Sequence, residues 1–148
     1  MKIFKIQKKK KMNETFFFEI IVACDEKNGI GKDGKLPWKC SEDLNLFRKL
    51  TENSVLIMGR KTVEKLPPLK DRKILCLTTN PSSVIPKSNN IICFSTAEQA
   101  LCFYKKHFKH LKLFVAGGER IYSLFLTTYF ENISKVHFSR ILWIYNCD

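Results

Sequence analysis

An aspartate that follows a tryptophan by five residues has surroundings suited to proton chemistry. Trp38 lies in a loop, and Ser41 is a plausible N-cap for a helix that carries an apolar stripe at Leu44, Phe47 and Leu50. On that helix Glu42 points to water, whereas Asp43 flanks the stripe. A carboxylate held among apolar neighbours has a raised pKa and can handle protons near neutrality. The alternative is that both acids only complement the helix dipole.

Three further segments have the composition of phosphate-binding turns. Gly59-Arg60-Lys61-Thr62 joins a predicted strand to a predicted helix, so backbone N–H groups and two cations converge there. Val115 to Tyr122 places Gly117-Gly118 between a strand and a helix, where a ligand can approach the backbone. Thr78-Thr79-Asn80 ends another strand. None of them is the Gly-x-Gly-x-x-Gly fingerprint, and Gly117-Gly118 is equally compatible with a simple tight turn.

The rest of the chain supplies the elements that must position these residues. Apolar runs predict strands at 16–24, 54–58, 74–78, 91–94, 111–116 and 133–141. Helices are expected at 41–50, briefly after Gly59, at 96–107 with Ser95 or Thr96 as cap, and at 119–126. Strands that alternate with helices predict an α/β domain with a mostly parallel sheet. No internal repeat or second domain is visible.

Charge is concentrated at the amino end. The 148 residues carry a formal net charge of +12, and residues 1–12 hold six lysines and no acid. We expect residues 1–15 to be a Lys-rich disordered tail, or upstream translation before a start at Met12. Binding of nucleic acid or a membrane surface is weakly supported, because no aromatic residues interleave with the lysine block.

Residues 16–23 are apolar after a basic segment and precede Cys24, which resembles a lipoprotein cleavage site. Glu19 interrupts that run and favours a buried strand instead, and no run is long enough to span a membrane. The six cysteines show no Cys-x-x-Cys and no zinc spacing, so we expect no metal site and a reduced, intracellular compartment. His107 and His110 belong to a Lys-rich helix end and are expected at the surface.

Four ordered motifs together carry a family resemblance over residues 17–148. They are Asn28-Gly29-Ile30-Gly31 with Leu36-Pro37-Trp38 and Asp43, then Ile57-Met58-Gly59-Arg60-Lys61-Thr62, Leu69-Lys70-Asp71-Arg72-Lys73-Ile74, and Val115-Ala116-Gly117-Gly118. In this order and spacing they resemble the dihydrofolate reductase family. The resemblance implies a three-layer α/β fold in which helices flank a central, mostly parallel sheet.

The resemblance also implies roles for the substrate side of the site. Asp43 would be the catalytic carboxylate that binds the pterin ring, with Trp38 and Ser139 beside it. Arg72 would bind the carboxylate of the glutamate tail. The walls of the pterin, nicotinamide and benzoyl pockets would come from Ala23, Ile30, Leu36, Leu44, Phe47 and Leu69.

On the cofactor side the resemblance implies NADPH rather than NADH. Arg60, Lys61 and Thr79 match the positions that hold the adenosine 2′-phosphate. Tyr122 would lie near the nicotinamide, and family members join Gly117 to Gly118 by a cis peptide. The pyrophosphate would be held by Gly59, Thr62 and the segment Ala116, Gly117, Gly118, Glu119, Arg120 and Ile121.

The chain departs from the family pattern at several positions. Ser139 stands where Thr is usual, Val63 replaces a common aromatic residue, and the loop around Pro67 is a residue shorter. Family members continue past Asp148 into two further strands, one of which pairs beside 133–141. We therefore expect a domain over 16–148 that is incomplete at its carboxyl end and lacks those two strands. Its strand 133–141 would expose an unpaired apolar edge.

The leading hypothesis is a cytoplasmic, NADPH-dependent reductase that converts 7,8-dihydrofolate to tetrahydrofolate in one-carbon and thymidylate metabolism. It would bind antifolate-like small molecules, and a thymidylate synthase domain is a possible partner outside this chain. The alternatives are a truncated, non-catalytic remnant and a basic nucleic-acid-binding protein. A riboflavin-pathway reductase of related fold is disfavoured by Trp38 and Asp43.

Overall fold

The computed structural model describes residues 2–5, 16–24, 41–66, 69–83 and 89–140. Its strands are β1 (Lys2–Lys5), β2 (Phe18–Cys24), β3 (Val55–Gly59), β4 (Lys73–Leu77), β5 (Ile91–Phe94), β6 (Leu113–Val115) and β7 (Ile133–Arg140). Its helices are α1 (Ser41–Thr51), α2 (Arg60–Lys65), α3 (Ala97–His107) and α4 (Glu119–Thr128). Short 3-10 turns cover Pro81–Ser83 and Phe130–Asn132.

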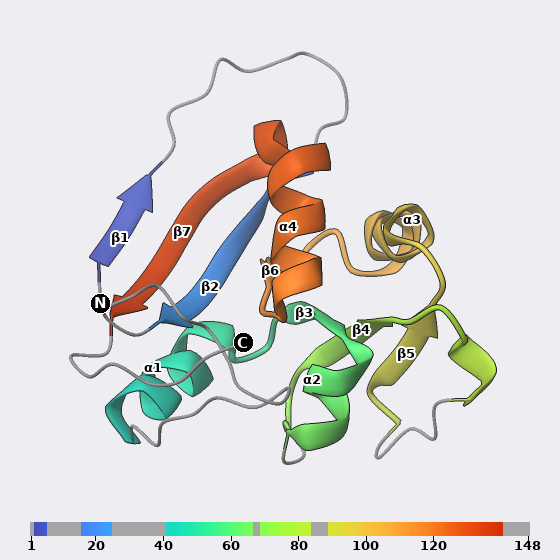
Figure 1. The fold of residues 1–148 in the computed structure, drawn as a ribbon, viewed down its shortest axis with the longest axis horizontal. Coiled ribbons are helices and arrows are strands. Elements are labelled where there is room, and N and C mark those ends of the chain that lie inside the picture. The colour runs from blue at the N-terminus through green and yellow to red at the C-terminus, as the bar shows by residue number, and fades with distance from the viewer. Residues whose placement is uncertain (1, 6–15, 25–40, 67–68, 84–88, 141–148) are drawn as a thin grey trace.

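The described strands form one seven-stranded sheet in the order β1-β7-β2-β6-β3-β4-β5 (Figure 1). Six of them, β2 to β7, are parallel, and β1 runs antiparallel to β7. The central strands are apolar without alternation because helices cover both faces of the sheet, as β3 shows with four consecutive buried residues. The α/β class and the mostly parallel sheet are confirmed.

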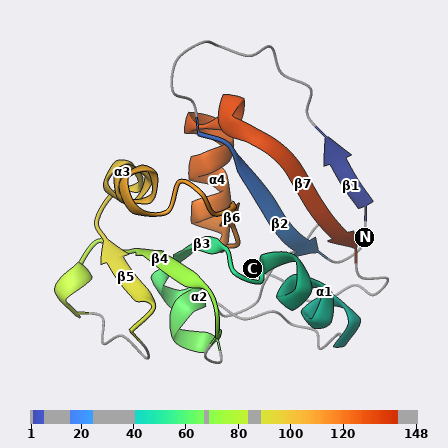
Figure 2. The same cartoon turned by 180° about the vertical axis from the view of Figure 1, so that it is seen from behind.

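Helices α3 and α4 cover one face of the sheet, and α1 and α2 lie on the other side (Figures 1 and 2). Alternate residues of the strands pack on α3 and α4, with Phe125 of α4 and Leu101 of α3 both buried among them. The residues between them, such as Leu56 and Met58 of β3, pack with Val63 of α2 and Phe47 of α1. The period of two along each strand therefore divides the core into two layers of side chains.

Local signals explain where the elements begin. Thr96 caps α3 because its hydroxyl oxygen accepts a hydrogen bond from the Gln99 N–H at 3.2 Å, and the last turn of α3 is basic. Asn53 and Asp71 have positive φ angles of 53° and 59° and make the turns before β3 and β4. Asn and Asp tolerate that conformation better than other side chains do.

The amino end of the chain differs from expectation. Lys2–Lys5, predicted to be part of a disordered tail, form strand β1. Because β1 pairs with residues 135–138, the prediction that β7 exposes an unpaired edge is wrong over those residues. Residues 6–15 lie outside the described part of the chain, and the domain limits and the absence of two further strands remain predictions.

Candidate functional site

The carboxyl ends of β3 and β6 bring two of the three predicted phosphate-type segments together. The Gly59 N–H donates to the Gly117 carbonyl at 2.9 Å, and the Ala116 N–H donates to the Ile57 carbonyl at 3.0 Å. The Ile121 side chain lies against Gly59, where an added Cβ would be 3.2 Å from its Cγ1. A ligand at the start of α2 would therefore also reach the start of α4.

Thr62 connects the two turns from the side of α2. Its Oγ1 lies 3.4 Å from the position of a Cβ on Gly118, and its Cγ2 lies 3.8 Å from that of a Cβ on Gly117. The Gly118 carbonyl accepts hydrogen bonds from the Ile121 and Tyr122 N–H groups and so begins α4. The hydroxyl of Thr62 thus lies beside Gly118 and its methyl group beside Gly117.

The third segment follows β4 at the same end of the sheet. Leu77, the last residue of β4, is in register with Gly59, the last residue of β3. Thr79 comes two residues after Leu77 and therefore lies at the same end of the sheet as the start of α2. The Thr78 N–H donates to the Phe94 carbonyl at 2.9 Å, and Thr79 is exposed. In parallel sheets ligands bind at the carboxyl ends of the strands, which is where all three segments lie.

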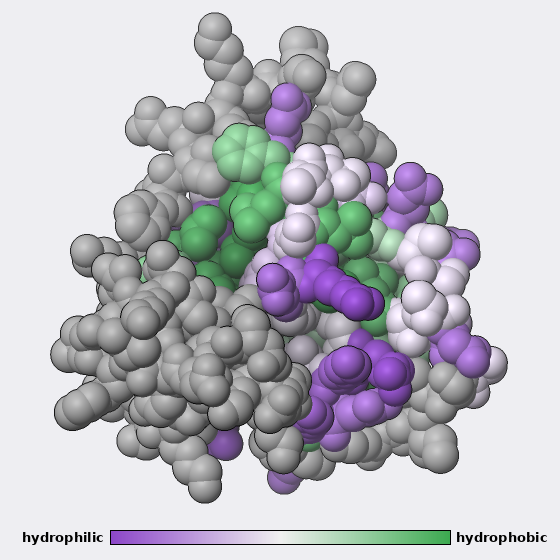
Figure 3. All heavy atoms as spheres, viewed as in Figure 1, coloured by the Kyte–Doolittle hydropathy of each residue, from purple (hydrophilic) through white to green (hydrophobic). Residues whose placement is uncertain are grey.

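Cations surround this end of the sheet. Arg60 and Lys61 are exposed at the start of α2, and Glu119 and Arg120 are exposed at the start of α4. Figure 3 shows hydrophilic side chains gathered over α2. Arg60 Nη1 lies 3.1 Å from Glu64 Oε1, one turn later on α2, and both side chains are exposed. An exposed ion pair of this kind contributes little, about 0.3–0.5 kcal/mol, so Arg60 is able to exchange Glu64 for another anion.

Gly117 has a backbone conformation that residues other than glycine rarely adopt. Its φ is 125°, and the peptide that joins it to Gly118 is cis, as the resemblance implied. A Cβ at Gly117 would lie 3.4 Å from the Tyr122 hydroxyl, which donates to the Ile21 carbonyl at 2.7 Å. Tyr122 thereby ties α4 to β2 directly beneath the glycine turn.

We expect Gly117→Ala to lower the free energy of unfolding by about 1–3 kcal/mol, because alanine is strained at this φ. The variant also brings a methyl group toward Tyr122 and Thr62. Urea denaturation measures the effect, and Gly118→Ala is the comparison, because Gly118 has a φ of −91° that alanine also adopts. Equal stability of the native chain and the Gly117 variant would contradict the conclusion that the φ of 125° at this position requires glycine.

The predicted substrate-side residues lie at the ends of β2 and β7 and on α1. Ala23 and Ser139 are half-buried and directly in register on neighbouring strands. Asp43 and Leu44 belong to the first turn of α1. Phe47 of α1 packs beside the buried Leu69 in the layer on that side of the sheet. The other predicted residues, Ile30, Leu36 and Trp38, lie outside the described residues.

Arg72 is buried, with 9% of its surface exposed, and its guanidinium is anchored to the end of α1. Its Nε donates to Thr51 Oγ1 at 2.9 Å, Nη1 donates to the Lys70 carbonyl at 2.6 Å, and Nη2 donates to the Arg48 carbonyl. Three of its five N–H donors are thus occupied by described residues, and the other two have no hydrogen-bond partner within the described part of the chain. The sequence predicted the residue but not these internal partners.

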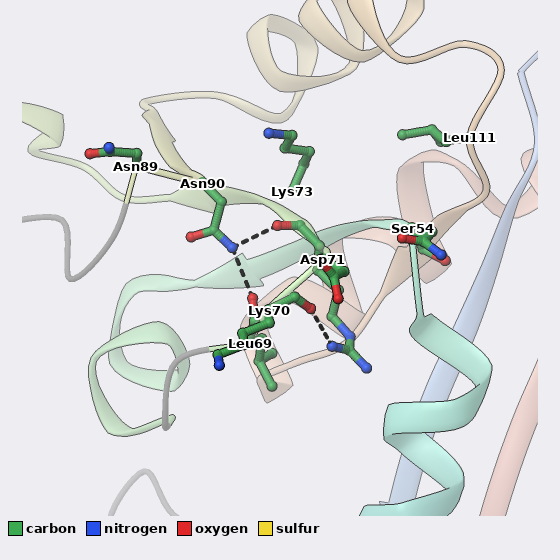
Figure 4. A pocket seen from close by; sticks show the side chains of 10 residues that line it. Ser54, Leu69, Lys70, Asp71, Lys73, Asn89, Asn90 and Leu111 are labelled. Atoms are coloured by element: carbon green, nitrogen blue, oxygen red, sulfur yellow. Dashed lines mark hydrogen bonds between the residues drawn. The ribbon is translucent and has the colours of Figure 1, made fainter.

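Arg72 also lines an open cavity of about 600 Å³ at the amino ends of β3, β4 and β5 (Figure 4). Asn90 closes one side, where its Nδ2 donates to the Leu69 and Arg72 carbonyls at 2.9 and 2.6 Å. Three of the lining side chains are cationic and one is anionic, which favours an acidic ligand. The full lining is Asn53, Ser54, Leu69, Lys70, Asp71, Arg72, Lys73, Asn89, Asn90 and Leu111.

A cluster of ionisable side chains around the buried Glu19 of β2 was not predicted. Glu19 Oε1 lies 3.1 Å from His137 Nε2 and 3.8 Å from Lys135 Nζ, and Glu19 Oε2 lies 3.9 Å from Lys112 Nζ. His137 Nδ1 is buried without a hydrogen-bond partner among the described residues. A glutamate inside an apolar strand was visible in the sequence, but its partner 118 positions away was not.

The thiols of β4, β5 and α3 lie at different depths. Cys76 is buried, Cys93 is half-buried and Cys102 is exposed, and all three are free thiols. Burial raises the pKa of the Cys76 thiol to about 12, so it stays protonated at neutral pH. His107 and His110 are exposed, as predicted.

The described side chains include no group of His, Cys, Asp and Glu that could hold a metal. None of the described helices is long and apolar enough to cross a membrane.

Comparison with known proteins gives the family. A family model for dihydrofolate reductase matches residues 17–143. The bifunctional dihydrofolate reductase-thymidylate synthase of Paramecium tetraurelia is 38% identical over 138 residues, which cover 92% of this chain and 28% of that protein. The dihydrofolate reductase of Enterococcus faecium is 36% identical over 110 residues, which cover 72% of this chain and 64% of that protein.

A solved structure agrees with the sequence relatives. Dihydrofolate reductase from Enterococcus faecalis, complexed with NADP(H) and the compound RAB-propyl, superimposes with a TM-score of 0.71 at 28% identity. The match covers 89% of this chain and 74% of that one. The chain spans about a quarter of the length of the bifunctional relatives that it matches. Sequence and fold together show that the chain belongs to the dihydrofolate reductase family.

Proposed function

We propose that the chain catalyses NADPH-dependent reduction of 7,8-dihydrofolate to 5,6,7,8-tetrahydrofolate. The observation that carries the proposal is the convergence of the two glycine turns, at Gly59 and Gly117, at the same end of the sheet as the paired Ala23 and Ser139. A dinucleotide held on the turns would extend toward the end of β2, where a pterin would meet it. Membership of the family and an NADP(H)-bound relative support the choice of reaction.

The residues present fit a phosphorylated dinucleotide. Gly117 leaves the space that a Cβ would fill, and its positive φ turns the chain into α4. Thr62 and the start of α4 would hold the pyrophosphate, since backbone N–H groups at a helix start favour anions. Arg60, Lys61 and Thr79 would hold the 2′-phosphate, which selects NADPH over NADH. When bound, the cofactor supplies the hydride that pterin C6 receives.

The substrate would lie between α1 and the sheet. Phe47 and Leu69 form an apolar wall for the benzoyl group, because both pack in the layer on the α1 side. Arg72 would bind the tail carboxylate with its two remaining N–H donors, and the cationic cavity beside it would receive that end of the ligand. Its anchoring to Thr51 fixes the guanidinium before the substrate arrives, which lowers the entropy cost of binding.

Proton delivery is assigned to the first turn of α1. Asp43 would bind the pterin ring and direct a proton through water to N5, which makes C6 a better hydride acceptor. Ser139 offers a hydroxyl at the end of β7, and Trp38 would close the site from the preceding loop. Thymidylate synthase is the functional partner that we propose, because the bifunctional relatives combine the two enzymes by name.

The test is dihydrofolate-dependent oxidation of NADPH, followed for the native chain, for Asp43→Asn and for Glu42→Gln. Asp43→Asn should lower kcat/KM by about 10²–10⁴-fold, because positioned acid–base groups contribute that much. Glu42→Gln is the matched control, since it removes a carboxylate from the same helical turn and should change kcat/KM less than twofold. A folded native chain without activity would support the non-catalytic alternative, and equal losses in both variants would refute the role of Asp43.

A further inference from the structure

Two cysteines lie side by side on neighbouring strands of the sheet. Cys76 of β4 is in register with Cys93 of β5, and the two strands are parallel (Figures 1 and 2). In-register residues of adjacent strands point to the same face of a sheet, and both thiols belong to the layer of core that packs against α2. Neighbouring strands are about 4.7–4.9 Å apart, which is within the Cα separation of about 4.4–6.8 Å that a disulfide spans.

The two thiols differ in access but affect one another. Cys76 is fully buried, whereas Cys93 is half-buried. The pKa of the Cys76 thiol is raised to about 12, first by burial and then by the charge of Cys93 and a hydrogen bond between the two side chains. Because Cys76 is protonated at neutral pH and closed to solvent, Cys93 is the thiol of the two that an oxidant in solution meets first.

Strand β5 has the freedom that a cross-link requires. It comes last in the order of the described strands, with β4 as its one neighbour among them, and it has four residues. A disulfide brings its two Cβ atoms to about 3.5–4.5 Å, so β5 must move toward β4 by about 1 Å. A short edge strand shifts more readily than a central one. Any strain that remains makes the disulfide easy to reduce, as is typical of regulatory disulfides.

We propose that Cys76 and Cys93 are a reversible redox pair, a dithiol in the reduced chain and a disulfide after reaction with a hydroperoxide. The peroxide oxidises the Cys93 thiol to a sulfenic acid, and its other oxygen leaves as water or an alcohol. The Cys76 sulfur then forms the S–S bond and displaces hydroxide from Cys93, and the Cys76 proton converts that hydroxide to water. One peroxide thus accepts two electrons and two protons from the pair. The proposal goes beyond the proposed function and does not depend on it.

Peptide mapping of the folded chain tests the pairing. Trypsin does not cut between Cys93 and Cys102, because residues 94–101 contain neither lysine nor arginine. The measurement therefore uses the Cys102→Ser variant, in which the changed side chain is exposed on α3. After treatment with hydrogen peroxide and alkylation of the remaining thiols, the peptides of Cys76 and Cys93 should be joined, and dithiothreitol should separate them. If both cysteines are recovered as alkylated thiols, or are linked only to other cysteines, the proposal is overturned.

Oxidation of the unfolded chain is the control for proximity. Five of the six cysteines remain in the Cys102→Ser variant. In urea no fixed geometry selects one pairing, so several linked peptides should form, whereas the link between Cys76 and Cys93 should predominate in the folded chain. The same mixture of links under both conditions would refute a preformed pair.

A second variant separates a redox pair from general oxidation of accessible thiols. Cys76→Ala in the Cys102→Ser chain removes the second thiol of the pair and keeps Cys93. A sulfenic acid without a thiol partner is oxidised further to sulfinic acid, which dithiothreitol does not reduce. After the same peroxide treatment, reduction should restore the Cys93 thiol in the chain that retains Cys76, and most of it should stay sulfinic acid in the Cys76→Ala chain. Equal recovery of the Cys93 thiol in both chains would contradict the role of Cys76.

Discussion

Replacement of Arg72 by methionine should destabilise the chain and also weaken the binding of one class of substrate. The variant removes the donors for Thr51 Oγ1 and for the Lys70 and Arg48 carbonyls, all partly or wholly buried. Buried acceptors without donors cost about 1–3 kcal/mol each, and partial access to water reduces the sum, so we expect a loss of about 2–4 kcal/mol. Denaturant unfolding measures this loss.

The functional effect of Arg72→Met should depend on the substrate's tail. We expect KM for dihydrofolate to rise about tenfold or more, because a charge-assisted hydrogen bond contributes about 1.5–3 kcal/mol. A dihydropterin without the benzoylglutamate tail should keep its KM, since it has no carboxylate for Arg72. Arg72→Lys is the control that retains the charge but not the paired donors. A KM that rises equally for both substrates would show general disorder of the site rather than loss of tail recognition.

Replacement of Phe125 by alanine should have the largest effect on stability. Phe125 is fully buried at the centre of α4, with its ring 5.2 Å from that of Phe18 in an edge-to-face arrangement and 5.2 Å from that of Tyr129. Deleting a buried aromatic ring typically lowers the free energy of unfolding by about 3–5 kcal/mol, through lost burial and the cavity that remains.

Leu126→Ala is the matched control for Phe125→Ala, because Leu126 is the next residue on α4 and is 45% exposed. We expect it to change the free energy of unfolding by less than about 1 kcal/mol. Thermal or urea unfolding of the three proteins gives the comparison. A small loss in the Phe125 variant would mean that α4 does not depend on the layer of core beneath it.

Local patterns predicted most of the described fold. The apolar runs at 91–94 and 54–58 correspond to β5 and β3, the second shifted by one residue, and Thr96 caps α3 as one of two predicted candidates. These features depend on neighbouring residues, so a single sequence contains their cause. The glycine turn could also be predicted from the sequence, because residues other than glycine rarely adopt the φ of 125° found at Gly117.

The pairing of β1 could not be predicted in the same way. Four residues, Lys2–Lys5, have too little pattern to indicate a strand, and their partners are 130 to 136 positions away. The contact between Glu19 and His137 could not be predicted for the same reason, since nothing local links two residues on separate strands. For Arg72 the family resemblance implied an anion site, but its hydrogen bonds to the end of α1 depend on how the turn before β4 is placed.

Cys76, Cys93 and Cys102 differ in exposure and so report how far the molecule opens. Cys102 on α3 is exposed, Cys93 on β5 is half-buried, and Cys76 on β4 is fully buried with a pKa of about 12. A thiolate-directed reagent near pH 8 should therefore react fastest with Cys102 on α3 and more slowly with Cys93 on the edge strand β5. It should find almost no thiolate at Cys76 on β4. Modification of Cys76 therefore requires that the layer of core between α2 and the sheet open, so its rate records the opening of that layer.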